Sequence, residues 1–150
     1  MGDQDYLNAL SRFLSDDDTL WSMVDGQIYT DYPDTQVLDA LTDTHKTLIG
    51  ITIIDDTGSG RLGAAYHGIM ENDVIFSIDV ASIYGDSAAY CRQVCSYIKD
   101  LVFKDVEKTL GGVTYQIMVT KVNVHVYYDD DAKYYHGVVT VTGDYRRTVT

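Results

Sequence analysis

Residues 122–133 read Val122-Asn-Val-His-Val-Tyr-Tyr-Asp-Asp-Asp-Ala-Lys133. Up to Tyr128 the apolar residues alternate with more polar ones, which is the period-two pattern of a strand with one buried face. The acidic segment Asp129–Lys133 predicts the turn of a hairpin, and Tyr135–Tyr145 predicts the returning strand. We therefore expect a β-hairpin in this part of the sequence.

Strands are also predicted upstream of the hairpin. Thr47–Ile54 is rich in β-branched residues and indicates a mostly buried strand. In Val74–Val80 the apolar residues alternate with Ser77 and Asp79, which indicates a half-buried strand. A brief strand is expected over Gly26–Thr30, before the turn that the only proline of the sequence marks.

Apolar residues recur at helical spacing at the start of the sequence and again after Gly85. The first set predicts a short amphipathic helix, and Ser15–Asp18 can cap a second short turn after it. The second set predicts the longest helix, over Asp86–Phe103, with an apolar face that should lie on the sheet. Another short helical stretch is expected over Asp105–Leu110. The first set comprises Tyr6, Leu7, Leu10, Phe13 and Leu14, and the second comprises residues 91, 94, 95, 98, 101 and 102.

These elements predict an α+β fold. A mostly antiparallel sheet would carry one long helix packed on a face, with a short N-terminal helix and a C-terminal β-hairpin. The length of 150 residues suits a single domain, and we find no repeat or linker that would divide residues 1–150. The composition, 45% hydrophobic and 23% charged, excludes wholesale disorder and a coiled coil.

The charge balance is the most unusual property of the composition. The sequence has 23 acidic residues against 11 basic ones, a formal net charge of −12. This excess argues against a protein that grips nucleic acid by its phosphates, because such binding needs clustered lysine and arginine. The start of the sequence lacks the pattern of a signal peptide, and no stretch is apolar enough to span a membrane. We expect a soluble protein made in the cytoplasm, with no membrane partner.

Motifs for metals, nucleotides and nucleophiles are incomplete. The run Asp16–Asp18 lacks the alternating ligands of a calcium loop, and Asp55–Gly60 lacks the Gly-Lys-Ser/Thr ending of a phosphate loop. Cys91 and Cys95 share an apolar helix face without further ligands at zinc-site spacing, so we interpret them as reduced core residues. We expect no bound cofactor or metal.

Two histidines leave one catalytic alternative open. His125 and His136 could be neighbours across the hairpin, near Asp129, where a hydrolytic or metal site would be conceivable. Polar residues on the solvated face of a sheet are the commoner explanation. Because the sequence also lacks a Gly-x-Ser-x-Gly motif, we expect a protein that is not an enzyme.

Tyrosine is unusually frequent, with 13 residues, and several cluster in Tyr127-Tyr128 and Tyr134-Tyr135 at the hairpin. Cross-strand aromatic packing is the structural explanation. A protein interface is the functional one, because tyrosine supplies contact area at low entropic cost. The two explanations are compatible at different positions.

The segment Val124–Val141 resembles the end of the tail terminator, or tail completion, proteins of long-tailed phages. In that family a strand runs into an acidic turn, and an aromatic-His-Gly-hydrophobic return strand follows. The resemblance extends in order of elements over nearly the whole chain, from the opening helix to the helix after Tyr84-Gly85. The matching hairpin residues are Asp129, Asp131, Tyr135, His136, Gly137 and Val138.

The resemblance implies a structural virion protein located in the tail or neck and made in the host cytoplasm. Family members form a ring, commonly of six copies, that caps the tail tube, ends its polymerisation and joins the tail to the head. The implied partners are other copies of the chain, the tail tube protein and the head connector or stopper protein. The alternatives are another neck, connector or tail tube component of the virion and, further away, a small hydrolase or ligand-binding domain.

A ring of six such chains would collect 6 × −12 = −72 charges, so its assembly is expected to depend on salt. A lumen lined with carboxylates would let DNA pass without specific binding. Basic residues are scarce, and we expect some of them to meet acidic partners across a subunit boundary. The candidate interface residues are Asp56, Arg61 and Tyr66 in an expected loop over Asp55–Gly68, and Arg146 and Arg147 near the end of the sequence. The alternative is that these charges are solvated and have no partner.

Overall fold

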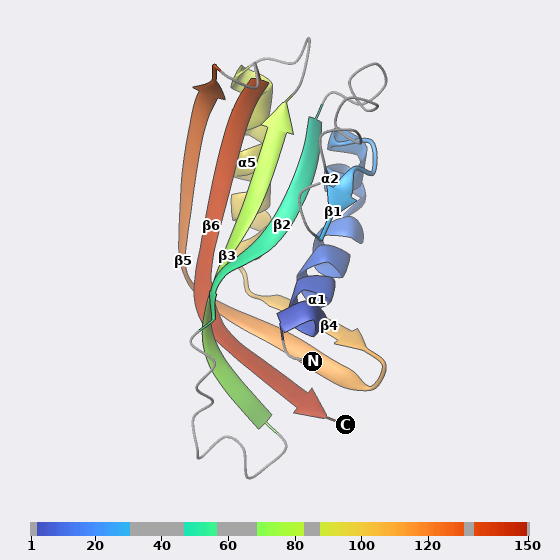
Figure 1. Ribbon diagram of the computed structural model, residues 1–150. Helices are drawn as coiled ribbons and strands as arrows, with labels where there is room; N and C mark the ends of the chain where they lie inside the picture. The colour runs from blue at the N-terminus through green and yellow to red at the C-terminus, as the bar shows by residue number, and fades with distance from the viewer. Residues whose placement is uncertain (1–2, 31–46, 57–68, 83–87, 131–133, 150) are drawn as a thin grey trace.

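The computed structural model describes residues 3–30, 47–56, 69–82, 88–130 and 134–149, which Figure 1 shows as coloured ribbons. The helices are α1 (Asp3–Ser15), α2 (Asp18–Met23) and α5 (Ala88–Val102). The strands are β1 (Ile28–Tyr29), β2 (Thr47–Asp56), β3 (Ile69–Ser82), β4 (Val106–Leu110), β5 (Val113–Asp129) and β6 (Tyr134–Val149).

The strands form one sheet in the order β1-β2-β3-β6-β5-β4. Every neighbouring pair is antiparallel except β1 and β2, which run parallel. β6 therefore lies between β3 and β5, although it follows both of them in the sequence. The predicted α+β fold with a mostly antiparallel sheet is confirmed, and so is the hairpin formed by β5 and β6.

The helices pack on one face of the sheet and share a single apolar core with it. α5 contributes Cys91, Val94, Cys95, Ile98 and Val102, which is the predicted face except that Leu101 is only partly buried. α1 also packs on the core, and the ring of Tyr6 meets that of Tyr115 in β5 edge to face at 5.6 Å between centroids. No helix in the described part of the chain has both the length and the apolar character needed to cross a membrane.

One prediction of local structure is corrected. Residues 106–110, expected to be helical, form β4 and pair antiparallel with β5. The intervening Gly111 and Gly112 have φ angles of 59° and 81°, which suit a two-residue hairpin turn. α5, with 15 residues, is the longest helix of the described ranges, and α1 has 13.

The sheet bends at a level where two of its strands are irregular. The register of β5 on β6 shifts after Val119, and that of β2 on β3 shifts after Ile53. Such bulges bend a strand and increase its twist. Figure 1 shows the bend, with α5 behind the half that ends in the β5–β6 turn and β4 beside the other half. Gly143 lies at the bend opposite Val119, and a Cβ atom there would be only 2.7 Å from the carbonyl oxygen of Met118.

Candidate functional site

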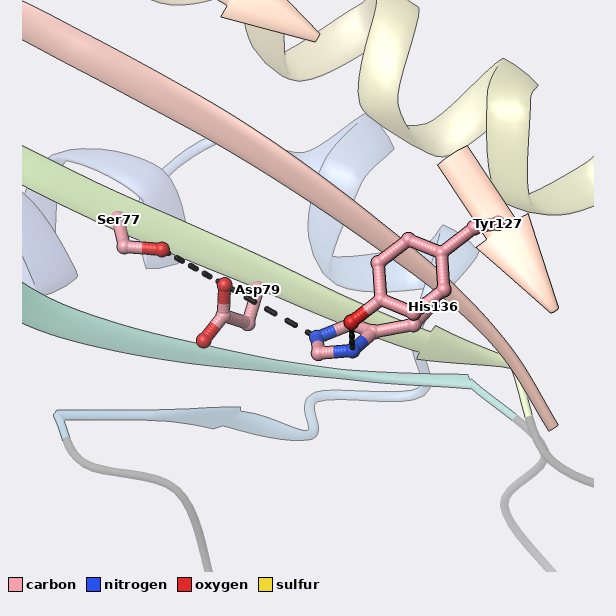
Figure 2. A network of polar contacts seen from close by, with 4 residues as sticks. All are labelled: Ser77, Asp79, Tyr127 and His136. Atoms are coloured by element: carbon pink, nitrogen blue, oxygen red, sulfur yellow. Dashed lines mark hydrogen bonds and ion pairs between the residues drawn. The ribbon is translucent and has the colours of Figure 1, made fainter. Parts of the chain in front are cut away.

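A polar network crosses the sheet on the face opposite the helices, near the β5–β6 turn (Figure 2). Ser77 and Asp79 come from β3, His136 comes from β6 and Tyr127 comes from β5. The hydroxyl of Ser77 donates to Oδ1 of Asp79 over 2.7 Å. The network therefore connects three adjacent strands at the end of the sheet that carries the predicted family motif.

His136 is at the centre of this network. Its Nδ1 atom lies 2.9 Å from the hydroxyl oxygen of Tyr127, and its Nε2 atom lies 4.0 Å from Oδ1 of Asp79. The second distance is too long for a hydrogen bond, and the contact becomes an ion pair only when the imidazole is protonated. Ser77 contacts the carboxylate and not the imidazole, so the order of contacts in a Ser-His-Asp triad is not made.

The two histidines of the catalytic alternative are separated by a tyrosine. His125 is in register with Val138, and His136 is in register with Tyr127. The ring of Tyr127 lies between them, with its centroid 5.4 Å from that of His125 and 5.2 Å from that of His136. Within the described ranges no group of three His, Cys, Asp or Glu side chains could hold a metal ion. The three rings therefore form one row on this face of the sheet.

Aromatic side chains also gather at this end of the sheet. Tyr128 and Tyr135 pack across β5 and β6 in an edge arrangement at 5.1 Å between centroids, so the predicted cross-strand packing is confirmed for this pair. On β5, Tyr127 and Tyr128 are nevertheless 39% and 47% exposed, and Val124 is 38% exposed. Several large apolar side chains are thus exposed to solvent along one strand, which indicates a candidate interaction surface.

Those predicted site residues that the structure describes fall at two opposite ends of the sheet. His136 and Arg146 are ten residues apart on β6, which is about 33 Å of strand. Arg146 is half-buried and in register with Glu71 of β3 and Gln116 of β5. The hairpin residues Asp129, Tyr135, Gly137 and Val138 lie with His136 at the other end.

The remaining predicted interface residues lie near Arg146 or outside the described residues. Arg147 is in register with Met70 and Tyr115, and Asp56 ends β2 opposite Val74. The sheet therefore brings Asp56, Arg146 and Arg147 to one end. Arg61, Tyr66 and Asp131 lie outside the described residues, and the interface role of the whole set stays a prediction.

The acidic run before α2 has a structural role. Oδ1 of Asp17 accepts a hydrogen bond from the backbone N–H of Leu20 over 2.9 Å, which confirms the predicted cap. The same oxygen accepts a hydrogen bond from the hydroxyl of Tyr97 in α5 over 2.7 Å, and this bond raises the pKa of Tyr97. Asp16 forms an ion pair with Lys108 of β4, whose hydrogen bond lowers the pKa of Asp16.

The fold is similar to that of a chain in the virion of a native gene transfer agent (GTA) particle, with a TM-score of 0.63 and 14% sequence identity over 93% of each chain. A virion component has this fold. A second solved structure, of a protein whose name states no function, has a TM-score of 0.55 and 14% identity, and the match covers 100% of this chain and 99% of that one. No family model and no curated protein matches the sequence.

Sequence reasoning did not identify Ser77 and Asp79 as site residues. Their alternation with apolar residues predicts that both face solvent, yet Ser77 is buried and Asp79 is partly buried. Their spacing of two residues is a signal that both lie on one strand face. This spacing does not predict that His136 lies near Asp79, because that position depends on how β3 and β6 pair.

Proposed function

We propose that this protein is a structural, non-enzymatic component of a virion that forms a ring at the end of the tail tube. The observation that carries the proposal is the fold likeness to a chain of a GTA virion over 93% of both chains. At 14% identity this likeness concerns the fold alone, so the terminator role rests on the resemblance of the hairpin motif from Asp129 to Val138.

In this role the ring, commonly of six copies, caps the tail tube and joins the tail to the head. Its partners are other copies of the chain, the tail tube protein and a head connector or stopper protein. The net charge of −12 per copy suits a lumen through which DNA passes without binding, because phosphates are repelled by carboxylates. The protein would reside in the tail or neck of the virion after synthesis in the host cytoplasm.

Assembly of the purified full chain tests the proposal. Light scattering and negative-stain microscopy over a series of protein and salt concentrations should show closed rings with a central hole. Ring formation should increase with salt, because screening reduces repulsion between the acidic copies. A terminator should stop at single rings, whereas another tube component of the tail should stack into tubes. A chain that never exceeds two copies under any condition would contradict the ring.

The contact residues can be tested separately. Arg61→Glu should prevent ring formation if Arg61 meets an acidic neighbour, whereas Arg92→Glu, at an exposed position of α5, should not. The double variant Arg146→Glu/Arg147→Glu should also lose rings. Circular dichroism and urea unfolding of each variant show whether the fold is retained. Rings from Arg61→Glu and from the double variant would reject these contacts and leave the ring proposal standing.

A further inference from the structure

One edge of β5 has no neighbouring strand among the described residues. β4 pairs with β5 only from Val113 to Ile117, whereas β6 pairs with β5 on its other side as far as Asp129. Figure 1 shows β5 as the outermost strand in the half of the sheet that ends at the β5–β6 turn. Residues 120–129 therefore present a row of backbone N–H and C=O groups that can pair with the strand of another chain.

Some apolar side chains along this edge are exposed to solvent, although they lie on the face of the sheet that carries the helices. Val122 and Val126 of β5 pack against the core, and Val124 and Tyr128 alternate with them on the same face. Val124 and Tyr128 are nevertheless 38% and 47% exposed, so α5 leaves the margin of this face uncovered. A second strand laid along β5 would bring its own side chains against both.

We propose that two copies of this chain pair antiparallel along their β5 edges, with His125 of one copy opposite His125 of the other. A two-fold axis perpendicular to the sheet keeps the helices of both copies on one side of a continuous sheet. In this register Lys121 of each copy lies opposite Asp129 of the other. On the helix face Val124 lies opposite Val126, and Val122 lies opposite Tyr128.

Charge complementarity selects this register. Opposing residues must point to the same face, so the two-fold axis can pass through His125 or through a neighbouring residue on β5. An axis at Val124 places Lys121 opposite Tyr127, and an axis at Val126 places Asp129 opposite Asn123. Only the axis at His125 joins Lys121 to Asp129, and symmetry makes that contact twice. A carboxylate has about four acceptor sites, so Asp129 can accept this contact in addition to those within its own copy.

The pairing is a different contact from that of a ring. It occupies the same edge on both copies and closes at two, whereas the contacts of a ring run head to tail. The inference therefore does not rest on the proposed function, and it describes the chain on its own in solution. The pairing also covers an edge that would otherwise invite aggregation.

A charge exchange tests the register. At low salt, where ring formation is least favoured, wild-type protein should be a dimer in mass photometry. Lys121→Asp and Asp129→Lys should each weaken dimerisation by about tenfold or more, because each places like charges opposite each other twice. The combined variant Lys121→Asp/Asp129→Lys should regain the wild-type dissociation constant within a few fold. A wild-type monomer at all concentrations, or a combined variant as weak as the single ones, would overturn the proposal.

Cross-linking gives an independent measurement that needs no charged residue. His125→Cys should form an intermolecular disulfide on mild oxidation, because opposing residues of an antiparallel pair lie about 4.5–5.5 Å apart between Cα atoms. Asn123→Cys is the matched control on the same face, where the two introduced thiols would be about 13 Å apart along the strand. The native Cys91 and Cys95 are buried. Equal cross-linking of the two variants, or none by His125→Cys, would reject the two-fold pairing whether or not the protein forms rings.

Discussion

Gly137 of β6 lies directly against Cys95 of α5. A Cβ atom built on Gly137 would be 2.3 Å from Sγ of Cys95 and 3.1 Å from Sγ of Cys91. Non-bonded heavy atoms in a packed core are normally separated by about 3.5–4.0 Å. The cysteine side chains of α5 therefore pack directly against the backbone of β6 at Gly137, with no room for a side chain there. This contact gives a physical reason for the glycine in the His-Gly pair of the predicted family motif.

We expect Gly137→Ala to lower the free energy of unfolding by about 1–3 kcal/mol, because the added methyl group overpacks the contact between α5 and β6. Cys95→Ala removes the sulfur atom that the methyl group meets. The double variant should therefore lose less stability than the sum of the two single variants. Urea unfolding of all four proteins measures this coupling, and strictly additive losses would show that the two positions do not touch.

Gly143→Ala should be destabilising for a different reason, because the nearest atom to its added Cβ is the backbone oxygen of Met118, at 2.7 Å. A backbone at the bend of the sheet cannot move aside as a side chain can, so we expect a loss of about 2 kcal/mol or more. Gly111→Ala is the comparison, since nothing lies within 4 Å of its Cβ and only its φ of 59° opposes the change. Thermal unfolding should rank Gly143→Ala as the more damaging, and the reverse order would contradict the close contact.

Asp17→Ala should cost about 1–2 kcal/mol of stability, because it removes the cap of α2 and the acceptor of the Tyr97 hydroxyl together. Tyr97→Phe removes only the second of these contacts and should cost less. Urea unfolding measures these losses. In an absorbance titration of the tyrosines, the midpoint of Tyr97 should lie at lower pH in Asp17→Ala than in the wild type, since the hydrogen bond to Asp17 raises the pKa of Tyr97. An unchanged titration would mean that the two groups do not interact in solution.

Lys108→Met should make the protein less stable at neutral pH and equally stable at low pH. Lys108 lowers the pKa of Asp16 from 3.8, so the stabilisation is complete above that value. It is lost as the pH falls through the lowered pKa of the folded state. Urea unfolding from pH 7 to pH 2 should show the difference between the two proteins shrinking in this window. Lys104→Met, which removes a charge but not this hydrogen bond, should lack the effect.

Cys91 and Cys95 should resist alkylation in the folded protein, because both side chains have 0% exposure. The hydrogen bond between the two thiols raises the pKa of Cys95 and lowers that of Cys91, so it is the burial of both side chains that should protect them. Iodoacetamide labelling followed by mass spectrometry should be slow in buffer and complete in urea. Rapid labelling without denaturant would show that α5 separates readily from β6.

The hairpin was predictable because its pattern is local. Val122 to Tyr128 alternate in polarity, and an acidic turn follows, so neighbouring residues alone define both strands. β4 was missed, although Gly111-Gly112 between two alternating runs is a hairpin signal, because the charged residues of 105–110 also suit a helix. β3 begins at Ile69, earlier than predicted. Glu71, Asn72 and Asp73 have low strand propensity, so the residue pattern did not indicate a strand there. Their pairing with β6 holds them in the sheet.

The contacts of the candidate site depend on which strands pair with one another, and the residue pattern within one strand does not show this. The His136 position was found from the motif, but its contacts with Tyr127 and Asp79 come from two different strands. Arg146 could be identified as a scarce basic residue, whereas its register with Glu71 required the position of β6 in the sheet. Residue type is visible in a sequence, and strand order is not.

The central position of β6 has a consequence for how the chain is made. β3 is complete at residue 82, but its neighbour β6 ends at residue 149, so the ribosome needs roughly 3–13 s to deliver the missing strand. During that interval the nascent β2–β3 pair has one open side. An open strand side of this kind can pair with a neighbouring nascent chain, so slower initiation that spaces ribosomes apart should raise the yield of folded protein.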